Sequence, residues 1–540
     1  MKEIALINGN IITLDEQVPE AEAVYIQDGK IVKVGDQQDI DSYITNDTEV
    51  IDLQGKTVLP GFIESHTHPL SFGIGSVFEL DCRASAVGSI EEMKSKLQEH
   101  ANQHQDHEWI YGYGWNENKL TEKQVPTKWD LDDAVPDRPV VLRRTCGHIY
   151  VANSKALELA GINQDTPDPP GGRIVRDSTT NEPTGVLEES ANLLLPKPKY
   201  SLADAAEGLR HVQDYCLRHG ITTIHEALIG KPFDYQVYQH AQRNNELDVR
   251  FRLWFWAIKN EERYGFLDSM IGMGLESGFG NDMLNIQGSK FMIDGAGSGK
   301  TAAVYEPYVD DPNNYGLLLY EEDKMISEIT RSIEHGLRVA VHAIGDHAME
   351  IAIKSFENAL NVKSTEEIRE MRNRIEHCVL PVGDHLERMK QLNLIASSST
   401  GFISQIGDNY CKYFGTERAN LMFPHRTYQK YGIVAPGNSD LPVTDANPFT
   451  GIYGLVTRKT ETGTLFAEHE AISTLDAIKA YTIDAAYAAC EEDKLGSISE
   501  NKLADLIVVS ENPLTVDPDH LKDLEVELTM VNGEVLYDKR

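Results

Sequence analysis

The sequence carries two histidines separated by a single residue, His66 and His68, in the string ESHTHP. They follow the apolar run VLPGFIES at 58–65, which is typical of a buried strand. Side chains two positions apart on a strand point to the same side, about two rises of ~3.3 Å apart. Both imidazoles can therefore face one metal ion. An isolated pair of this kind is also common on protein surfaces, so the interpretation depends on the other residues.

Polar residues recur at the ends of three later strand-like runs. His342 lies in VAVHAIGD, His377 in RIEHC and Asp440 in GNSDLP. Each alone could be a packed core histidine, or a carboxylate that accepts hydrogen bonds from nearby backbone. Four strand ends with such residues are hard to explain by packing, because burying polar groups is costly. We therefore expect His66, His68, His342, His377 and Asp440 to bind a divalent metal.

Lys290 lies inside another apolar run, NIQGSKFMID at 285–294. Burial of an ammonium group is unfavourable and lowers the pKa of the amine. One interpretation is an ion pair with Asp294. The other is that the neutral amine takes up CO₂ and becomes a carbamate, an anionic ligand whose two oxygens can bridge two cations.

A parallel barrel is the fold that brings these strand ends together. Eight runs qualify as buried strands, at 58–65, 221–227, 250–257, 285–294, 338–345, 374–379, 393–399 and 432–440. Amphipathic helical stretches such as 322–336 and 346–361 lie between them. Right-handed crossovers place the C-terminal ends of all strands on one face. We expect a (β/α)₈ TIM-type barrel over 58–495.

The rest of the chain forms two further parts. The long gap after the first strand predicts an inserted subdomain at about 75–205, over the barrel mouth, because a loop of that length without structure is improbable. Its His148 either reaches the site as an oxyanion donor or substrate contact, or has a surface or packing role. Trp109, Tyr111, Tyr113 and Trp115 form either a subdomain core or a pocket wall. The strand-rich ends, 1–57 and 496–540, predict one small β-sandwich domain, or else two separate β appendages.

The combined pattern resembles the amidohydrolase superfamily. The strings GFIESHTHPL, KFMIDGAGS, VHAIGDHAM, RIEHC and GNSDLPV are similar to the amidohydrolase family 3 subgroup that includes N-substituted formamide deformylases. The resemblance covers nearly the whole chain. It departs from the family at one point, since NSD replaces the more usual GSD, although Ser439 still precedes Asp440. The resemblance implies a metal site formed by His66, His68, Lys290, His342, His377 and Asp440.

Ligands of this kind suit zinc best, with manganese, iron and cobalt as alternatives, and either one or two ions. Asp440 would take the proton of an activated water and pass it to the leaving nitrogen. His342 or a second ion, with His148, would polarise the substrate carbonyl; His225 would support the ligands. We expect hydrolysis of a non-peptide C–N bond in an N-acyl or N-formyl amine or a cyclic amide. Ester or phosphoester hydrolysis, isomerisation, and metal-dependent binding without catalysis remain alternatives.

Composition limits the partners. The chain has 540 residues, 85 acidic against 50 basic, and a net charge of −35, which disfavours nucleic acid and anionic lipid surfaces. Its six cysteines lack CxxC spacing, and the N-terminus lacks an apolar signal segment, so we expect a cytoplasmic protein. Its partner is then a small-molecule substrate, and the sequence is compatible with a homodimer.

Overall fold

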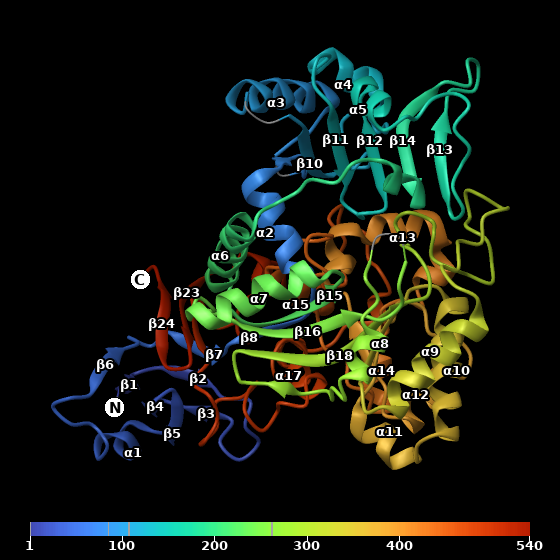
Figure 1. Ribbon diagram of the computed structural model, residues 1–540. Helices are drawn as coiled ribbons and strands as arrows, with labels where there is room; N and C mark the ends of the chain where they lie inside the picture. Colours follow the sequence, from blue (N-terminus) through green and yellow to red (C-terminus); the bar gives the residue numbers. More distant parts are fainter. Residues whose placement is uncertain (1, 85, 106–107, 261–262) are drawn as a thin grey trace. The chain divides into compact units, whose positions relative to one another are not determined.

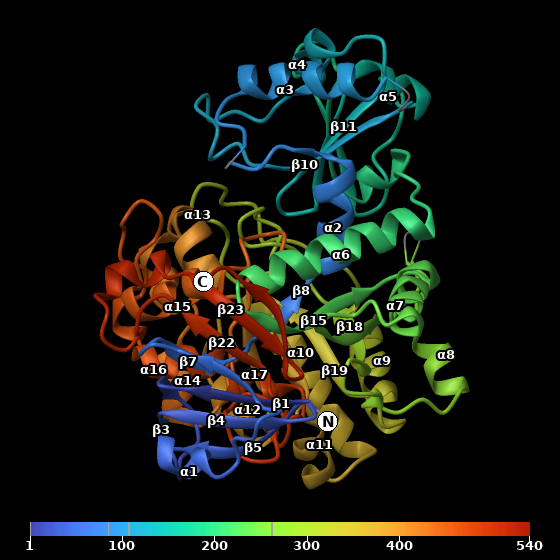
Figure 2. The same ribbon diagram turned by 90° about the vertical axis from the view of Figure 1, so that its left-hand side faces the viewer.

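The computed structural model describes residues 2–84, 86–105, 108–260 and 263–540, which fold into two compact units (Figures 1 and 2). One unit comprises Met1–His68 together with Gln213–Arg540, and it contains both ends of the chain. The other unit is Pro69–Val212. The insertion expected at about 75–205 falls within this second unit.

The first unit is built around a parallel barrel. Seven strands lie side by side in sequence order: β8 (Phe62–Thr67), β15 (Ile221–Ile229), β16 (Arg250–Trp256), β18 (Leu284–Met292), β19 (Val339–Ala343), β20 (Arg374–His377) and β21 (Ile395–Ser398). Most of their residues are fully buried, which explains why they appear in the sequence as nearly continuous apolar runs.

The eighth position of the barrel is an irregular segment rather than a regular strand. Val434 and Pro436 accept backbone hydrogen bonds from β21, and Gly437 forms an isolated parallel bridge with Ser398. Pro436 has no N–H to donate, and the Gly437 N–H bonds to Ala480 instead. The Asp440 N–H donates to the His66 carbonyl at 3.1 Å and so closes the barrel against β8.

The first predicted strand, 58–65, is in fact two strands. β7 (Thr57–Pro60) belongs to a different sheet, and β8 begins after Gly61. A Cβ at Gly61 would lie 2.4 Å from the Thr222 side chain, so only glycine allows β8 and β15 to approach here.

Helices cover the outside of the barrel (Figure 1). Their bounds are α7 (Pro232–Asn244), α8 (Leu267–Gly272), α9 (Glu322–Glu334), α10 (Asp346–Asn358), α11 (Thr365–Met371), α12 (His385–Gln391), α13 (Gly401–Ala419), α14 (His425–Tyr431), α15 (Pro448–Thr457), α16 (Thr474–Ala480) and α17 (Ile483–Ala488), while α6 (Leu202–Arg218) spans the boundary between the two units. The resulting strand–helix alternation confirms the expected TIM-type barrel.

Both ends of the chain contribute to a small β-sandwich. One sheet has the order β5 (Lys30–Gly35), β4 (Ala23–Gln27), β1 (Glu3–Ile7) and β6 (Glu49–Asp52), next to the short helix α1 (Gln37–Asp41). The second sheet has the order β24 (Glu534–Asp538), β23 (Val526–Val531), β22 (Leu506–Val509), β7, β2 (Asn10–Ile12) and β3 (Glu20–Ala21). The two sheets share a core that includes Leu6, Val58 and Leu528.

The second unit has its own sheet and core. Its sheet follows the order β13 (Gly172–Arg176), β14 (Pro183–Glu189), β12 (Ile149–Ala152), β11 (Val140–Arg144), β10 (Ile110–Trp115) and β9 (Leu80–Asp81). Its helices are α2 (Pro69–Phe78), α3 (Ile90–Gln103), α4 (Lys128–Ala134) and α5 (Ser154–Leu159). Tyr113 and Trp115 are buried, as the core interpretation predicts, whereas Trp109 and Tyr111 stack on each other and are partly exposed.

Across the described residues, none of the helices combines the length and the apolar character that a membrane crossing requires.

Candidate metal centre

The C-terminal ends of the barrel strands bring the predicted ligands to one level. The register pairs Met292 of β18 with His342 of β19, and Ala343 with His377 of β20. His66 lies near the end of β8 and Asp440 follows the irregular eighth segment. These positions form the face of a TIM-type barrel at which side chains from several strands can meet.

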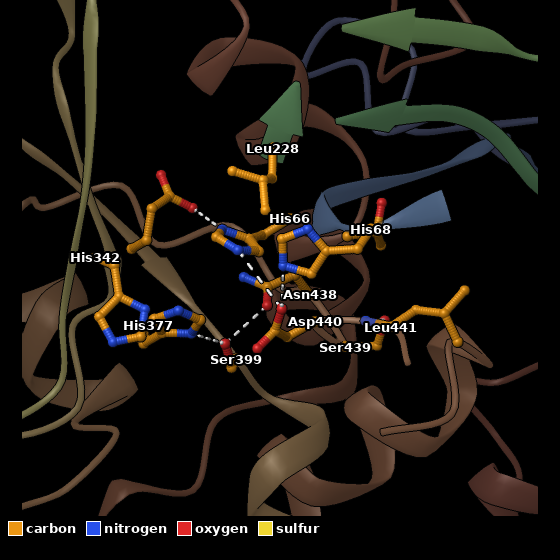
Figure 3. A network of polar contacts seen from close by, with 12 residues as sticks. His66, His68, Leu228, His342, His377, Ser399, Asn438, Ser439, Asp440 and Leu441 are labelled. Atoms are coloured by element: carbon orange, nitrogen blue, oxygen red, sulfur yellow. Dashed lines mark hydrogen bonds and ion pairs between the residues drawn. The ribbon is translucent and has the colours of Figure 1, made fainter. Parts of the chain in front are cut away.

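Three of these residues meet in the structure. His66, His377 and Asp440 each offer one ligand atom, and the three atoms lie within 4.8 Å of one another. All three residues are buried, with exposed fractions of 7% or less. The Nε2 atom of His66 lies 3.5 Å from Oδ1 of Asp440. Figure 3 shows the rings of His66 and His68 turned towards this carboxylate.

The other three predicted ligands border this cluster. The Nε2 atom of His68 lies 3.3 Å from Asp440 Oδ1. The His342 ring packs edge-on against His377 with 4.4 Å between ring centroids, and its Nε2–H donates to the Gly295 carbonyl at 3.0 Å. That bond leaves Nδ1 of His342 as the nitrogen with a lone pair. Lys290 is 4% exposed, and within the described structure its amine has no hydrogen-bond partner.

Left-handed backbone at two strand ends turns the ligands inward. His377 has φ 66° and Asp440 has φ 54°, values that non-glycine residues rarely adopt. On a regular strand Glu376 and His377 would face opposite sides of the sheet. Because the backbone leaves the extended conformation at His377, both side chains approach the same centre. Strain of this kind concentrates at functional sites.

Hydrogen bonds on the far side of two rings fix which nitrogen faces the centre. Nδ1–H of His66 donates to a Glu376 carboxylate oxygen. Nδ1 of His377 lies 2.7 Å from Ser399 Oγ, whose own hydrogen goes to Asn438 Oδ1 at 2.8 Å. Ser399 must therefore accept from His377 Nδ1–H. Both rings consequently present an Nε2 lone pair towards Asp440.

The charges of the site suit a cation. Burial lowers the pKa of His66 to about 4 and of His377 to about 3, so both rings are neutral at pH 7. The buried Oδ1 atom of Asp440 lies 3.3 Å from Nε2 of His68 and 3.5 Å from Nε2 of His66. Although burial opposes it, Asp440 and Glu226 raise the pKa of His68 to about 9, so without a metal this ring supplies the positive charge beside the carboxylate. Neutral imidazoles and one carboxylate that converge in this way fit a divalent metal such as zinc.

Lys290 does not form the ion pair with Asp294 that was one interpretation of the sequence. The Asp294 carboxylate instead accepts backbone N–H bonds from Ala303, Ile344 and Gly345, at 2.9–3.1 Å. Burial lowers the pKa of the Lys290 amine from 10.5 to about 8. The lowered pKa increases the share of neutral amine near neutral pH, and the neutral amine is the form that reacts with CO₂.

Comparison with known proteins identifies the family. A family model described as "Amidohydrolase family" matches residues 49–537. The chain belongs to the amidohydrolase family. The resemblance predicted from its sequence motifs is therefore confirmed.

Relatives match this amidohydrolase over nearly its full length. It is 32% identical to the YtcJ protein of Bacillus subtilis, over 98% of both chains. It is 27% identical to the N-substituted formamide deformylase of Arthrobacter pascens, over 100% of this chain and 99% of that protein. The crystal structure of an uncharacterised metal-dependent hydrolase from Pyrococcus horikoshii superposes with a TM-score of 0.76 at 27% identity, covering 96% of this chain and 99% of that one.

Two further histidines that the sequence suggested for the site, His148 and His225, lie in different parts of the structure. His148 of the amidohydrolase lies in the insertion, with Nδ1 2.9 Å from Glu189, and its part in the reaction stays a prediction. His225 lies within β15, and its Nδ1 accepts a hydrogen bond from Arg374 at 2.8 Å. It is therefore connected to the ligands through Arg374 and Glu376.

Sequence reasoning missed the carboxylates that support the ligands. Glu376 was visible in RIEHC as the neighbour of His377, but its contact with His66 depends on two strands far apart in the chain. Glu64 accepts bonds from both N–H and Oγ of Ser439 and so holds the residue before Asp440. A signal existed, since Glu64 lies two positions before His66 and faces the same side of its strand.

Proposed function

We propose that this amidohydrolase hydrolyses a non-peptide C–N bond in a small molecule, an N-acyl or N-formyl amine or a cyclic amide. The observation that supports it is the buried convergence of His66, His377 and Asp440 at the C-terminal end of the barrel. The sequence similarity to an N-substituted formamide deformylase supports the same bond type. We propose that the site holds a divalent cation, zinc. When bound, this cation would lower the pKa of a water molecule towards neutral pH and would polarise the acyl carbonyl group.

Asp440 has the position of the general base. Its Oδ1 is buried and lies beside Nε2 of both His66 and His68. It can take a proton from the attacking water and return it to the nitrogen that leaves, so that the amide C–N bond breaks and a free amine forms. His342 is the residue we propose to hold the acyl oxygen while negative charge develops on it.

Lys290 is proposed to act as a carbamate. Its neutral amine would form a new N–C bond with CO₂ and release one proton, which converts the lysine into an anionic ligand. The buried amine without a partner supports this proposal. The added negative charge matters most for two ions, because Asp440 is the single carboxylate among the predicted ligands and two close divalent cations repel each other.

The test is a substrate panel of N-formyl amines, N-acetyl amines, cyclic amides and matched esters, followed by mass spectrometry. The proposal expects a free amine from at least one amide class, released about 10²–10⁴-fold more slowly by the Asp440→Asn variant. Turnover of esters with no amide turned over by the metal-loaded protein would contradict it. We further propose a cytoplasmic location, because all six cysteines are free thiols, as is usual in a reducing compartment.

A further inference from the structure

A buried carboxylate, that of Glu376, lies directly behind the ring of a predicted metal ligand. We propose that Glu376 is a positioning residue for His66. It holds the ring in the one tautomer and orientation that present Nε2 to the metal centre, and Arg374 in turn holds Glu376. This inference rests on the proposed metal-dependent function.

The contacts of Glu376 use both of its oxygens. Oε2 accepts from Nδ1–H of His66 and from the Arg374 guanidinium at 2.9 Å, while Oε1 accepts from Arg374 Nε at 2.7 Å. Arg374 and Glu376 are both 1% exposed or less. The carboxylate is thus held by two directed bonds from one rigid group, which leaves little freedom for its third bond, to His66.

Arg374 links four strands of the barrel. From β20 it donates to the Ser65 carbonyl of β8 at 2.6 Å, to Nδ1 of His225 in β15 at 2.8 Å and to Ser397 Oγ of β21 at 2.9 Å. Ser65 directly precedes His66, so the same guanidinium fixes the backbone beside the ligand and the carboxylate behind its ring. The centroid of the Trp254 ring lies 5.0 Å from the guanidinium carbon.

The charges of this arrangement act in one direction. The Arg374 guanidinium donates to both oxygens of Glu376, so Glu376 faces His66 as a hydrogen-bond acceptor. A carboxylate can only accept hydrogen bonds, and His66 must then carry its proton on Nδ1. A carboxylate behind a ligand histidine also raises the basicity of the other nitrogen, and loss of such a partner typically costs 10–100-fold in metal affinity.

Two substitutions separate positioning from stability. In Glu376→Gln an amide NH₂ replaces one carboxylate oxygen. Both oxygens accept hydrogen bonds from Arg374, so in either orientation of the amide its NH₂ group faces an N–H donor of Arg374. Glu376→Asp keeps the charge beside Arg374 but withdraws the carboxylate from His66. Metal-free proteins would be titrated with Zn²⁺ in competition with a chromophoric chelator. We expect both variants to lower zinc affinity by about 10–100-fold.

Glu491→Gln is the matched control. Glu491 is also a buried partner of a buried arginine, accepting from Arg252 Nε at 2.6 Å and from Asn285 at 2.9 Å, but neither contact involves a ligand histidine. It should lower the unfolding temperature of the metal-free protein, as Glu376→Gln should, yet leave zinc affinity unchanged.

Three outcomes bear on the inference. Wild-type zinc affinity in Glu376→Asp, shown to be folded by circular dichroism, would overturn it. Equal loss of affinity in Glu491→Gln and Glu376→Gln would also overturn it, because the effect would then follow from general destabilisation. If the wild-type protein binds no zinc at all, the proposed metal-dependent function fails, and this inference fails with it. If the wild-type protein binds zinc and Glu376→Asp binds it equally well, this inference alone fails.

Discussion

Replacement of Lys290 by methionine should stabilise the metal-free protein while it removes function. Methionine has a similar length and volume but carries no amine, so the buried site loses a charge without gaining a large cavity. Burial lowers the pKa of Lys290 from 10.5 to about 8, and this interval corresponds to roughly 3 kcal/mol. We therefore expect the free energy of unfolding to rise by up to about 3 kcal/mol at pH 7.

The sign of the pH dependence follows from which state holds the proton. Below pH 8 the lysine is protonated in both the folded and the unfolded chain, so the folded state bears the full cost of the buried ammonium. Above pH 10.5 the amine is neutral in both states and the cost is absent. The advantage of Lys290→Met should therefore be full at pH 7 and shrink between pH 8 and pH 10.5.

Thermal unfolding of chelator-treated proteins at pH 7 and pH 10 measures this effect, with CO₂ excluded so that no carbamate forms. Metal content and amide turnover would be measured on the same preparations after zinc is restored. An equal or lower unfolding temperature for Lys290→Met at pH 7 would refute the reasoning about the buried charge. Full metal content and activity in that variant would refute the carbamate.

Three further predictions concern the metal, the base and a histidine outside the site. Elemental analysis should find one or two divalent ions per chain, with turnover lost on chelation and regained on adding metal; turnover that survives complete removal argues against the proposed chemistry. Asp440→Asn should lower kcat by about 10²–10⁴-fold with a much smaller change in KM, measured by steady-state kinetics. Near-normal kcat would remove Asp440 from the mechanism. Burial, reinforced by Arg458, lowers the pKa of His425 from 6.5 to about 3. Below pH 6.5 the unfolded chain binds a proton at this histidine before the folded chain does, so the free energy of unfolding decreases as pH falls. His425→Gln should therefore gain up to about 3 kcal/mol relative to wild type between pH 7 and pH 4.5 in denaturant titrations; a difference independent of pH would contradict this.

The barrel strands were predictable because burial on both faces leaves long apolar runs. RFRLWFW of β16 and VAVHA of β19 are examples, and both occur where the sequence indicates strands. The irregular backbone at the eighth position of the barrel was harder to predict. The run GIVAPGNSD is apolar enough for a strand, but Pro436 removes one donor and the pairing becomes irregular.

The ligands were easier to predict than the residues that orient them. Histidines at strand ends are recognisable because packing alone rarely places several of them at the same end of a barrel. Glu376 and Ser399 form their contacts across strands that are distant in sequence, and a single sequence contains no record of those distances. The left-handed backbone at His377 was likewise not visible, because no glycine or asparagine marks the turn.

The pairing of β7 has a consequence for how the protein is synthesised. β7 continues almost directly into the first barrel strand, but it pairs with β22, which lies close to the end of the chain. Domains generally begin to fold from the N-terminus as the ribosome proceeds. Here Val58 and Leu59 must wait for Ile507 and Val508 before their strand is covered. A nascent chain that stops before β22 would expose an apolar strand edge, which is a template for aggregation. Synthesis of β22 is therefore the step at which this apolar edge can be covered.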